Sequence, residues 1–302
     1  MDTPAHPDAG PVDTAGWSPP LPEAAGFHHR VVDTPGLRTH VATIGEGPPV
    51  VLLHGFPQHW WQWHDIAPAI AEHGYRVLCP DLRGAGWTSA DDPRIDRETR
   101  LRDVVALLDV LGLDRVDLVS HDMGSITAMQ LSYDHPERVR SAVQLSVPPG
   151  FLSFSPRMHT AFHHLPPLLF HRPGASVGGT FSPTYAAHEM SAATVAAHLS
   201  PMQRPEVDAA VRPLCRRLVA PEGVRMMAGV YRRRRLTVPT LFVFGRREHT
   251  FTEELVDRIC HAPERYADRA EFAYVDDAAH FITDDAPDAV VDLAVDWFAR
   301  AA

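Results

Sequence analysis

Predicted strands and helices alternate along most of this 302-residue chain. Most of the predicted strands are short apolar runs bounded by turn residues, and they lie at 29–34, 38–44, 49–53, 76–79, 116–119, 139–145, 240–244 and 272–275. The predicted helices lie at 61–73, 97–111, 124–134, 253–262 and 287–300. Regular alternation of this kind predicts an α/β fold, with a mostly parallel, eight-stranded sheet and helices on both faces.

The alternation stops over residues 149–235. Helical fragments there are interrupted by many of the 28 prolines of the chain. We expect an all-helical insertion over this range, which divides one core into residues 26–148 and 236–302. Residues 1–25 are rich in Pro, Ala, Gly and Asp and lack apolar periodicity, so they are predicted to form a flexible or loosely docked extension.

Composition excludes several classes of function. The formal charge is −10, from 28 Lys+Arg against 38 Asp+Glu, and the lack of a basic stripe argues against nucleic acid as a partner. No stretch approaches 18 apolar residues, so we expect no membrane span. Cys79, Cys215 and Cys260 form neither a CxxC pair nor a disulfide pattern, which favours the reducing cytoplasm. The sequence leaves a monomer and a homodimer both open.

The most informative motif runs from Val116 to Ser125, where a buried strand is followed by a sharp turn and a helix. This is the layout of a nucleophile elbow, in which a small residue two before and a glycine two after the reactive position allow a tight turn. The reactive position holds Asp122, with Gly124 after it and Ser120 in place of the usual first glycine. The helix N-terminus favours an ionised carboxylate there. An ordinary helix-capping aspartate is the alternative interpretation.

A second loop begins at Leu53, after the third predicted strand, and has the sequence LHGFP. A loop in this position supplies backbone N–H groups to an oxyanion hole in some hydrolytic folds, so we expect Phe56 and Met123 to provide the two donors, with His54 beside them. A plain strand-ending turn is the alternative. In the aromatic cluster that follows, Trp60 either lines a substrate pocket or packs the first helix against the sheet.

Two further candidates follow late strands. Glu248 comes just after the strand at 240–244 and is a candidate orienting acid, with a surface glutamate as the alternative. His280 follows the last strand and is the candidate base, although it is one of 19 histidines. The order Asp122, Glu248, His280 is nucleophile, acid, histidine, and the carboxyl ends of parallel strands meet at one edge of the sheet. We therefore expect the three side chains to lie together.

Several stretches resemble the epoxide hydrolase and haloalkane dehalogenase branch of the α/β-hydrolases, from about Gly26 to the C-terminus. They are His54-Gly55-Phe56-Pro57-Gln58, the run from Pro80 to Ser89, His121-Asp122-Met123-Gly124 and Ala279-His280-Phe281. The resemblance implies the α/β-hydrolase fold, with the insertion as a helical cap or lid. It also implies lid residues that point at the nucleophile: Tyr231 would activate an epoxide oxygen, and His159 would be a second activating residue. Tyr185 is the alternative to His159.

A carboxylate nucleophile suits displacement at saturated carbon, which leaves an alkyl ester on the enzyme. Water activated by His280 and Glu248 would hydrolyse this ester, and neither step needs a metal ion or an organic cofactor. An epoxide opens to a basic alkoxide that a tyrosine is suited to protonate, whereas a halide needs only donors such as an indole N–H. We expect hydrolysis of an apolar epoxide to a vicinal diol by Asp122 and Tyr231. The alternatives are a haloalkane dehalogenase and a non-catalytic binding protein of the same fold.

Overall fold

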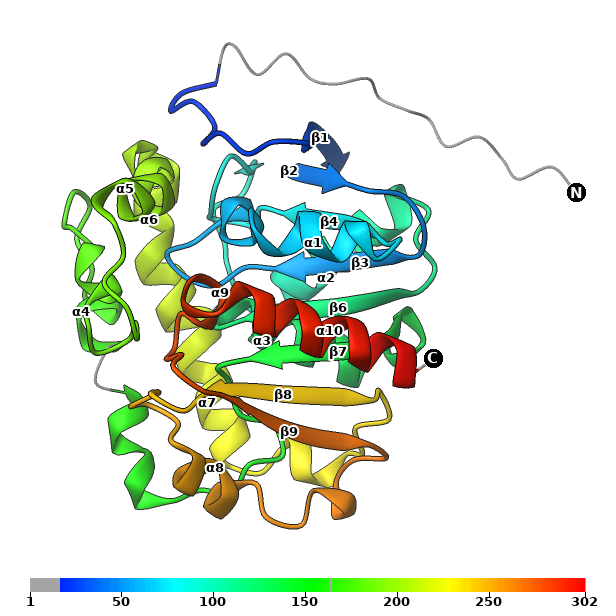
Figure 1. Ribbon diagram of the computed structural model, residues 1–302. Coiled ribbons are helices and arrows are strands. Elements are labelled where there is room, and N and C mark those ends of the chain that lie inside the picture. Colours follow the sequence, from blue (N-terminus) through cyan, green and yellow to red (C-terminus); the bar gives the residue numbers. More distant parts are fainter. Residues whose placement is uncertain (1–16, 163–164, 302) are drawn as a thin grey trace, which may run out of the picture.

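A mostly parallel sheet forms the centre of the structure, a computed structural model that describes residues 17–162 and 165–301 (Figure 1). Its strands are β1 (His28–Thr34), β2 (Leu37–Ile44), β3 (Pro49–Leu53), β4 (Arg76–Pro80), β5 (Ser89–Ala90), β6 (Val116–His121), β7 (Val139–Leu145), β8 (Thr240–Gly245) and β9 (Ala270–Val275). Within the described residues, eight strands lie in the order β1-β2-β4-β3-β6-β7-β8-β9, and the two-residue β5 pairs with β2. The strands from β4 to β9 in this order are parallel, and β1 and β2 are antiparallel. The predicted α/β fold is confirmed.

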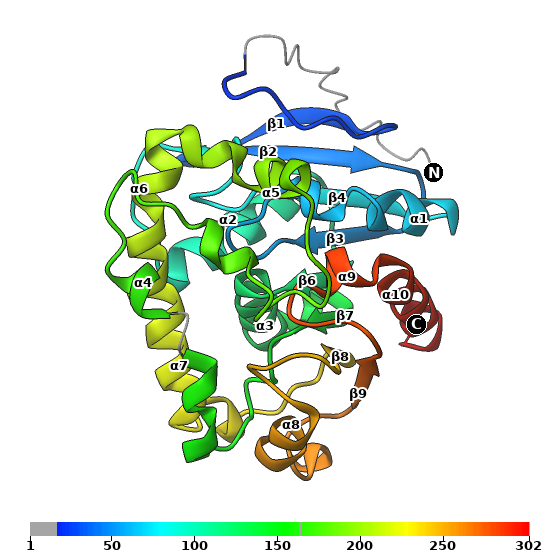
Figure 2. The same cartoon turned by 60° about the vertical axis from the view of Figure 1, so that its left-hand side comes forward.

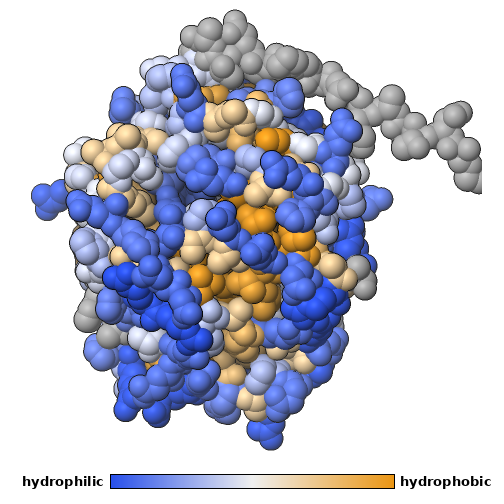
Figure 3. All heavy atoms as spheres, viewed as in Figure 1, coloured by the Kyte–Doolittle hydropathy of each residue, from blue (hydrophilic) through white to orange (hydrophobic). Residues whose placement is uncertain are grey.

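Helices cover both faces of the sheet (Figures 1 and 2). One face carries α1 (Ile66–Glu72) and α10 (Pro287–Ala301), and the other carries α2 (Arg97–Val110), α3 (Met123–Asp134) and α8 (Glu253–Ile259). The view of the molecule in Figure 3 is mostly hydrophilic, with a hydrophobic area near its middle, over α1 and α10. The two helical layers thus enclose the sheet and leave its carboxyl edge for the loops.

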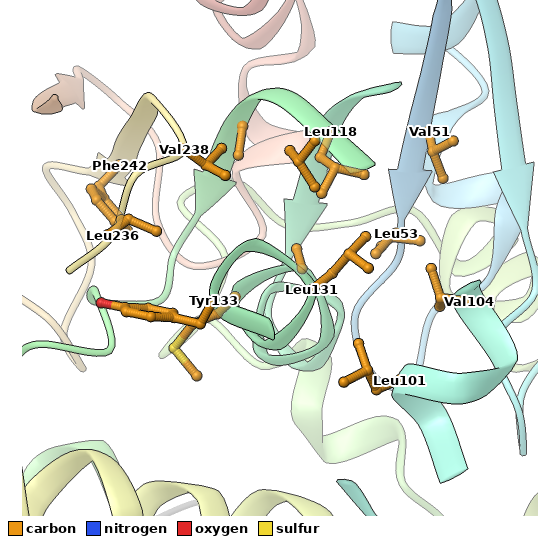
Figure 4. Close-up of a cluster of buried hydrophobic side chains, with 14 of the residues drawn as sticks. Val51, Leu53, Leu101, Val104, Leu118, Leu131, Tyr133, Leu236, Val238 and Phe242 are labelled. Atoms are coloured by element: carbon orange, nitrogen blue, oxygen red, sulfur yellow. The ribbon is translucent and has the colours of Figure 1, made fainter. Parts of the chain in front are cut away.

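Side chains of the central strands are buried on both faces of the sheet. In β3, Val50 and Leu52 belong to the cluster beneath α1 and α10, whereas Val51 and Leu53 belong to the cluster beneath α2 and α3. Figure 4 shows part of this second cluster, with Leu118 of β6 among the strand residues. Burial on both faces explains why these strands are unbroken apolar runs in the sequence.

The described part of the chain between β7 and β8 consists of helices joined by turns and loops, and it contains no strand. Its α-helices are α4 (Leu165–Leu169), α5 (Ala192–Leu199), α6 (Pro205–Leu214) and α7 (Ala220–Met227). They lie beyond the carboxyl ends of the parallel strands, over the loops that carry the candidate residues (Figures 1 and 2). In the described part of the chain, no helix has the length and apolar character needed to cross a membrane. The expected boundaries of the insertion stay predictions.

The segment before β1 is docked on the core over its described part. The Pro19 carbonyl accepts a hydrogen bond from the indole N–H of Trp87 at 2.7 Å, and Trp17 packs against the core cluster beneath α1. Residues 17–25 thus contact the core through aromatic side chains, and the predicted extension over residues 1–25 stays a prediction. The rest of the predicted extension, residues 1–16, lies outside the described residues.

Replacing Leu118 with Ala should lower the free energy of unfolding by about 2–5 kcal/mol. Leu118 is fully buried in β6, so its truncation leaves a cavity between strand and helix. Urea denaturation followed by circular dichroism measures the change. Val110→Ala is the control: Val110 is 52% exposed, and its truncation should cost less than about 0.5 kcal/mol. Equal losses in the two variants would contradict this description of the core.

Candidate active site

Asp122 occupies a strained turn between the end of β6 at His121 and the start of α3 at Met123. Its backbone has φ 47° and ψ −122°, a conformation that residues other than glycine rarely adopt and that costs on the order of 1–3 kcal/mol. The turn also packs closely on β3, because a Cβ atom at Gly124 would lie 2.2 Å from the carbonyl oxygen of Leu53. The glycine that the elbow motif requires is thus needed for this close approach, which holds the carboxylate at the edge of the sheet.

The structure brings Asp122, Glu248 and His280 together. The Nε2 atom of His280 lies 3.7 Å from Oδ1 of Asp122, and its Nδ1 atom donates to Oε2 of Glu248 at 3.1 Å. The other oxygen of Glu248, Oε1, accepts the backbone N–H of Thr250 at 2.8 Å, which fixes the orientation of the acid. The loops after β6, β8 and β9 therefore place a carboxylate, a histidine and an orienting acid in contact.

Two further contacts fix the backbone of the histidine. The carbonyl of His280 accepts the Nε2–H of His121 at 2.8 Å and the hydroxyl of Ser146 at 2.8 Å. Sequence reasoning missed both residues. Their positions were the available signal, because His121 ends β6 and Ser146 directly follows β7, at the same edge of the sheet.

The charges in this group shift the pKa of each member. Burial alone would lower the pKa of His280, but the carboxylates of Glu248 and Asp122 outweigh it and raise this pKa to about 10. Burial alone would raise the pKa of Asp122, but His280 outweighs it and holds this pKa well below its usual range. The pKa of Glu248 is lowered in the same way, because His280 outweighs burial. At neutral pH the group is therefore carboxylate, imidazolium, carboxylate.

Two cavities meet at Asp122 and His280. The larger has a volume of about 410 Å³ and a mainly apolar wall, which includes Leu152, Met158, Leu165, Leu169, Met226 and Met227. The smaller has a volume of about 30 Å³, and Tyr185 and Thr180 lie in its wall. An apolar cavity of several hundred Å³ with a few polar groups at one end is typical of a small-molecule site.

The loop after β3 supplies one of the expected oxyanion donors. The N–H of Phe56 donates to Oδ2 of Asp122 at 2.9 Å. Met123 lies in the wall of the smaller cavity, and its role as the second donor stays a prediction. His54 supports the loop: it accepts the N–H of Leu82 at Nε2, at 2.9 Å, and it lines neither of the cavities at Asp122. His54 was expected at the oxyanion and substrate-binding loop, and this is corrected to a supporting role, because its side chain binds the backbone of Leu82.

Trp60 packs the core and does not line a pocket. Its side chain is fully buried, and its ring lies edge-on to that of His29 with centroids 4.6 Å apart. Its backbone N–H donates to Oδ1 of the buried Asp81 at 2.8 Å. Of the two interpretations left open by the sequence, the structure supports packing, and the interpretation of Trp60 as a substrate-binding residue that lines a pocket is wrong.

The structure does not bring Tyr231 to Asp122, and the expectation that it points at the nucleophile is corrected. The Tyr231 side chain is fully buried, its hydroxyl donates to Glu222, and its ring centroid lies 4.7 Å from that of Tyr133. Glu222 belongs to α7 and Tyr133 to α3. A buried glutamate needs donors, and Tyr231 supplies one. Tyr231 therefore joins α7 to the core, outside both cavities at Asp122.

His159 also lies outside the cavities at Asp122. It is exposed on the 3-10 turn Pro156–Phe162, where its Nδ1 atom donates to the Pro156 carbonyl at 3.2 Å. The expectation that His159 activates the substrate is therefore corrected, because the turn that carries it directs the side chain to solvent.

Tyr185 is the phenol that the structure brings to the site. It lines the smaller cavity together with Asp122 and His280, and its ring centroid lies 6.3 Å from that of His280. Burial and the Glu248 carboxylate raise the pKa of Tyr185 above its ordinary value. The hydroxyl therefore keeps its proton at neutral pH.

Part of the chain is similar in sequence to known proteins. The family model of the α/β hydrolase fold matches residues 48–166. The chain is 42% identical over 123 residues to Epoxide hydrolase 2 of Siraitia grosvenorii, an alignment that covers 40% of this chain and 39% of that protein. It is 38% identical over 125 residues to Soluble epoxide hydrolase of Corynebacterium sp. (strain C12), covering 41% of this chain and 43% of that protein. The chain thus spans about two-fifths of the length of these curated relatives.

Solved structures resemble the chain over almost its whole length. The epoxide hydrolase CorEH without ligand has a TM-score of 0.76 and 24% identity, over 91% of this chain and 100% of that one. The epoxide hydrolase VrEH1 from Vigna radiata has a TM-score of 0.73 and 25% identity, over 91% of this chain and 98% of that one. The fold is therefore that of the α/β-hydrolases. In sequence, the chain is similar to curated epoxide hydrolases over about two-fifths of its length.

Replacing Asp122 with Asn should lower the pKa of His280 from about 10. Asparagine has nearly the same shape but no charge, so one of the two carboxylates that raise this pKa is lost while burial still opposes the charged imidazole. NMR titration of the imidazole nitrogens measures the change, with His280→Gln used to identify the resonance. An unchanged pKa would contradict the electrostatic coupling between the two side chains.

Proposed function

We propose that this protein is an epoxide hydrolase that converts an apolar epoxide to a vicinal diol. One observation carries the proposal: the Asp122 carboxylate has one oxygen on the N–H of Phe56 and the other beside His280, in a cavity whose wall contains the phenol of Tyr185. The similarity to curated epoxide hydrolases supports the same activity.

In the first half-reaction, Oδ1 of Asp122 attacks a carbon of the epoxide, and the bond from that carbon to the epoxide oxygen breaks. The oxygen leaves as an alkoxide and takes the phenolic proton of Tyr185. The products are a hydroxyalkyl ester of Asp122 and a tyrosinate. The hydrogen bond from Phe56 holds Oδ2, which leaves Oδ1 as the attacking atom.

Formation of the ester prepares the base for the second half-reaction. The esterified Asp122 is neutral, so one of the two carboxylates that raise the pKa of His280 is gone. The imidazolium then gives its proton to the tyrosinate of Tyr185. This restores the phenol and leaves a neutral imidazole, oriented by Glu248.

In the second half-reaction, neutral His280 takes a proton from water as the water oxygen attacks Cγ of Asp122. Negative charge develops on Oδ2, beside the N–H of Phe56, which stabilises it. Collapse of this intermediate breaks the bond from Cγ to Oδ1. The leaving oxygen takes the second proton of the attacking water, and the diol is released. Asp122 returns as a carboxylate and His280 as an imidazolium. Neither half-reaction calls for a metal ion or an organic cofactor.

The helical segment of residues 149–235 acts as a lid in this proposal. It contributes Tyr185 to the smaller cavity and much of the wall of the larger one, including Met226 and Met227. An apolar wall of this kind favours an apolar substituent on the epoxide. The three cysteines of the chain are buried and free, which supports a reducing compartment such as the cytoplasm.

A haloalkane dehalogenase with the same nucleophile is the alternative. A halide leaving group needs N–H donors such as an indole, and among the described residues no tryptophan lines either cavity at Asp122. Trp60 and Trp63, which follow the Phe56 loop, are fully buried in the core. The cavity walls therefore favour an epoxide, which a phenol is suited to protonate.

A His280→Gln variant should accumulate a covalent ester on Asp122 when it is incubated with a panel of apolar epoxides. The variant keeps the nucleophile but lacks the base that activates water, so the first half-reaction proceeds and the second is slowed by about 10²–10⁴-fold. Mass spectrometry of the peptide that contains Asp122 detects the adduct, and the wild-type protein should release the diol.

Three results would count against the proposal in different ways. If no epoxide labels Asp122 and the wild-type protein instead releases halide from alkyl halides, the protein is a dehalogenase. If the wild-type protein binds these compounds without turning over either class, it is a binding protein. If the Asp122→Asn control protein still forms a covalent adduct, another residue is the nucleophile.

A further inference from the structure

We propose that Asp285 is a positioning residue, which holds the Tyr185 segment against the catalytic loop so that the phenol reaches the substrate. The inference rests on the proposed function, because it assigns to Asp285 an effect on epoxide opening. Asp285 is the last residue of α9 (Ile282–Asp285), the short helix that follows His280, and it has no contact of its own with the cavities at Asp122.

The carboxylate of Asp285 joins two loops that lie far apart in the sequence. On one side, Oδ2 accepts the backbone N–H of Ala187 at 2.9 Å, and Oδ1 accepts that of His188 at 3.1 Å. On the other side, Oδ2 accepts the N–H of Ala279 at 2.9 Å, next to His280. A carboxylate that accepts several backbone N–H groups forms charge-assisted hydrogen bonds, which are stronger than neutral ones. Asp285 is thus a direct link between the helical segment and the core.

Tyr185 lies between this link and the catalytic histidine. Its carbonyl accepts the N–H of Phe281 at 3.1 Å, and the two residues bound by Asp285 follow it almost directly in the chain. The Tyr185 backbone is therefore tied to the residue after His280 as well as to Asp285. These contacts set the position of the phenol ring relative to His280 and to the cavity at Asp122.

Loss of the Asp285 carboxylate should affect Tyr185 more than His280. His280 has independent support from Glu248, His121 and Ser146, so its orientation does not depend on the contact at Ala279. The hydrogen bonds that tie the Tyr185 segment to the core include the Phe281 contact and an exposed one from the His188 ring to the Asp277 carbonyl at 3.1 Å. The N–H groups of Tyr185 and Ala186 donate within the segment itself, to the Ser182 carbonyl, so they do not replace the link through Asp285. The expected defect therefore lies in the step that uses the phenol.

Asp285→Asn is the substitution that tests this role. Asparagine keeps the shape of the side chain but has only one acceptor oxygen. Its NH₂ group would replace the other oxygen and face a backbone N–H group, so that hydrogen bond is lost. The rate of ester formation with an apolar epoxide should fall about tenfold, since misplacement of a reacting group by about 1 Å costs up to about 10²-fold. The rate of ester hydrolysis should stay within about twofold. Single-turnover experiments, quenched and analysed by mass spectrometry, measure both rates.

A double-mutant cycle with Tyr185→Phe separates positioning from a general loss of structure. If Asp285 acts through the phenol, Asp285→Asn has no further effect on ester formation once the hydroxyl is absent. Asp285→Glu, which retains a carboxylate, should recover part of the rate. Asp292→Asn removes the same charge from an exposed position on α10 and should leave both rates unchanged.

The outcomes distinguish failure of this inference from failure of the proposed function. Suppose that Tyr185→Phe slows ester formation. The positioning role is overturned if adding Asp285→Asn to that variant slows ester formation further, or if Asp285→Asn alone slows ester hydrolysis as much as ester formation. In both cases the epoxide hydrolase reaction stands. If Tyr185→Phe leaves ester formation unchanged, the role of the phenol itself is overturned, and that of Asp285 with it. Asp285→Ser, which keeps one acceptor, gives the same cycle if the Asn variant does not fold.

Discussion

The imidazolium of His280 lies between the carboxylates of Glu248 and Asp122, and the rest of the site depends on this order of charges. Each carboxylate stabilises the proton on His280, and the imidazolium in turn keeps both carboxylates ionised despite their burial. The group therefore contains an ionised nucleophile before reaction. In the proposed reaction, formation of the ester removes the charge of Asp122, so His280 can act as a base when the ester is hydrolysed.

The sheet explains how three residues far apart in the sequence reach this arrangement. Asp122, Glu248 and His280 follow β6, β8 and β9, which run parallel and end at one edge. Ser146 follows β7, between them, and ties the His280 backbone to that edge. The strained conformation of Asp122 is maintained because β6 and α3 on either side of it are buried. Packing of the core thus compensates for the unfavourable backbone conformation of Asp122.

The strands and the order of the three polar residues could be predicted from the sequence because their signals are local. Apolar runs such as Val50 to Leu53 identify strands buried on both faces, and Gly124 identifies the elbow. The choice of phenol could not be predicted in this way. Whether Tyr231 or Tyr185 reaches Asp122 depends on how the helices between β7 and β8 pack.

Residues that act through long-range contacts left no local signal. The buried Glu222 that binds Tyr231 cannot be distinguished in sequence from a surface glutamate. The position of Trp60 could not be predicted either, because it depends on contacts with distant residues such as His29 and Asp81. The link from Asp285 to Ala187 spans 98 residues and depends on the approach of two loops that only the folded chain brings together. The sequence shows which residue types are present, whereas the packing of the helical segment decides which of them act together.

The most direct measurement is the fate of oxygen in one turnover with an apolar epoxide in H₂¹⁸O, with enzyme in excess of substrate. If Asp122 attacks the epoxide and water then attacks Cγ, the diol takes its new oxygen from the protein. Mass spectrometry should find unlabelled diol and ¹⁸O in the peptide that contains Asp122. Labelled diol and an unlabelled peptide after the first turnover would mean that water attacks the epoxide directly, which would contradict a covalent mechanism at Asp122.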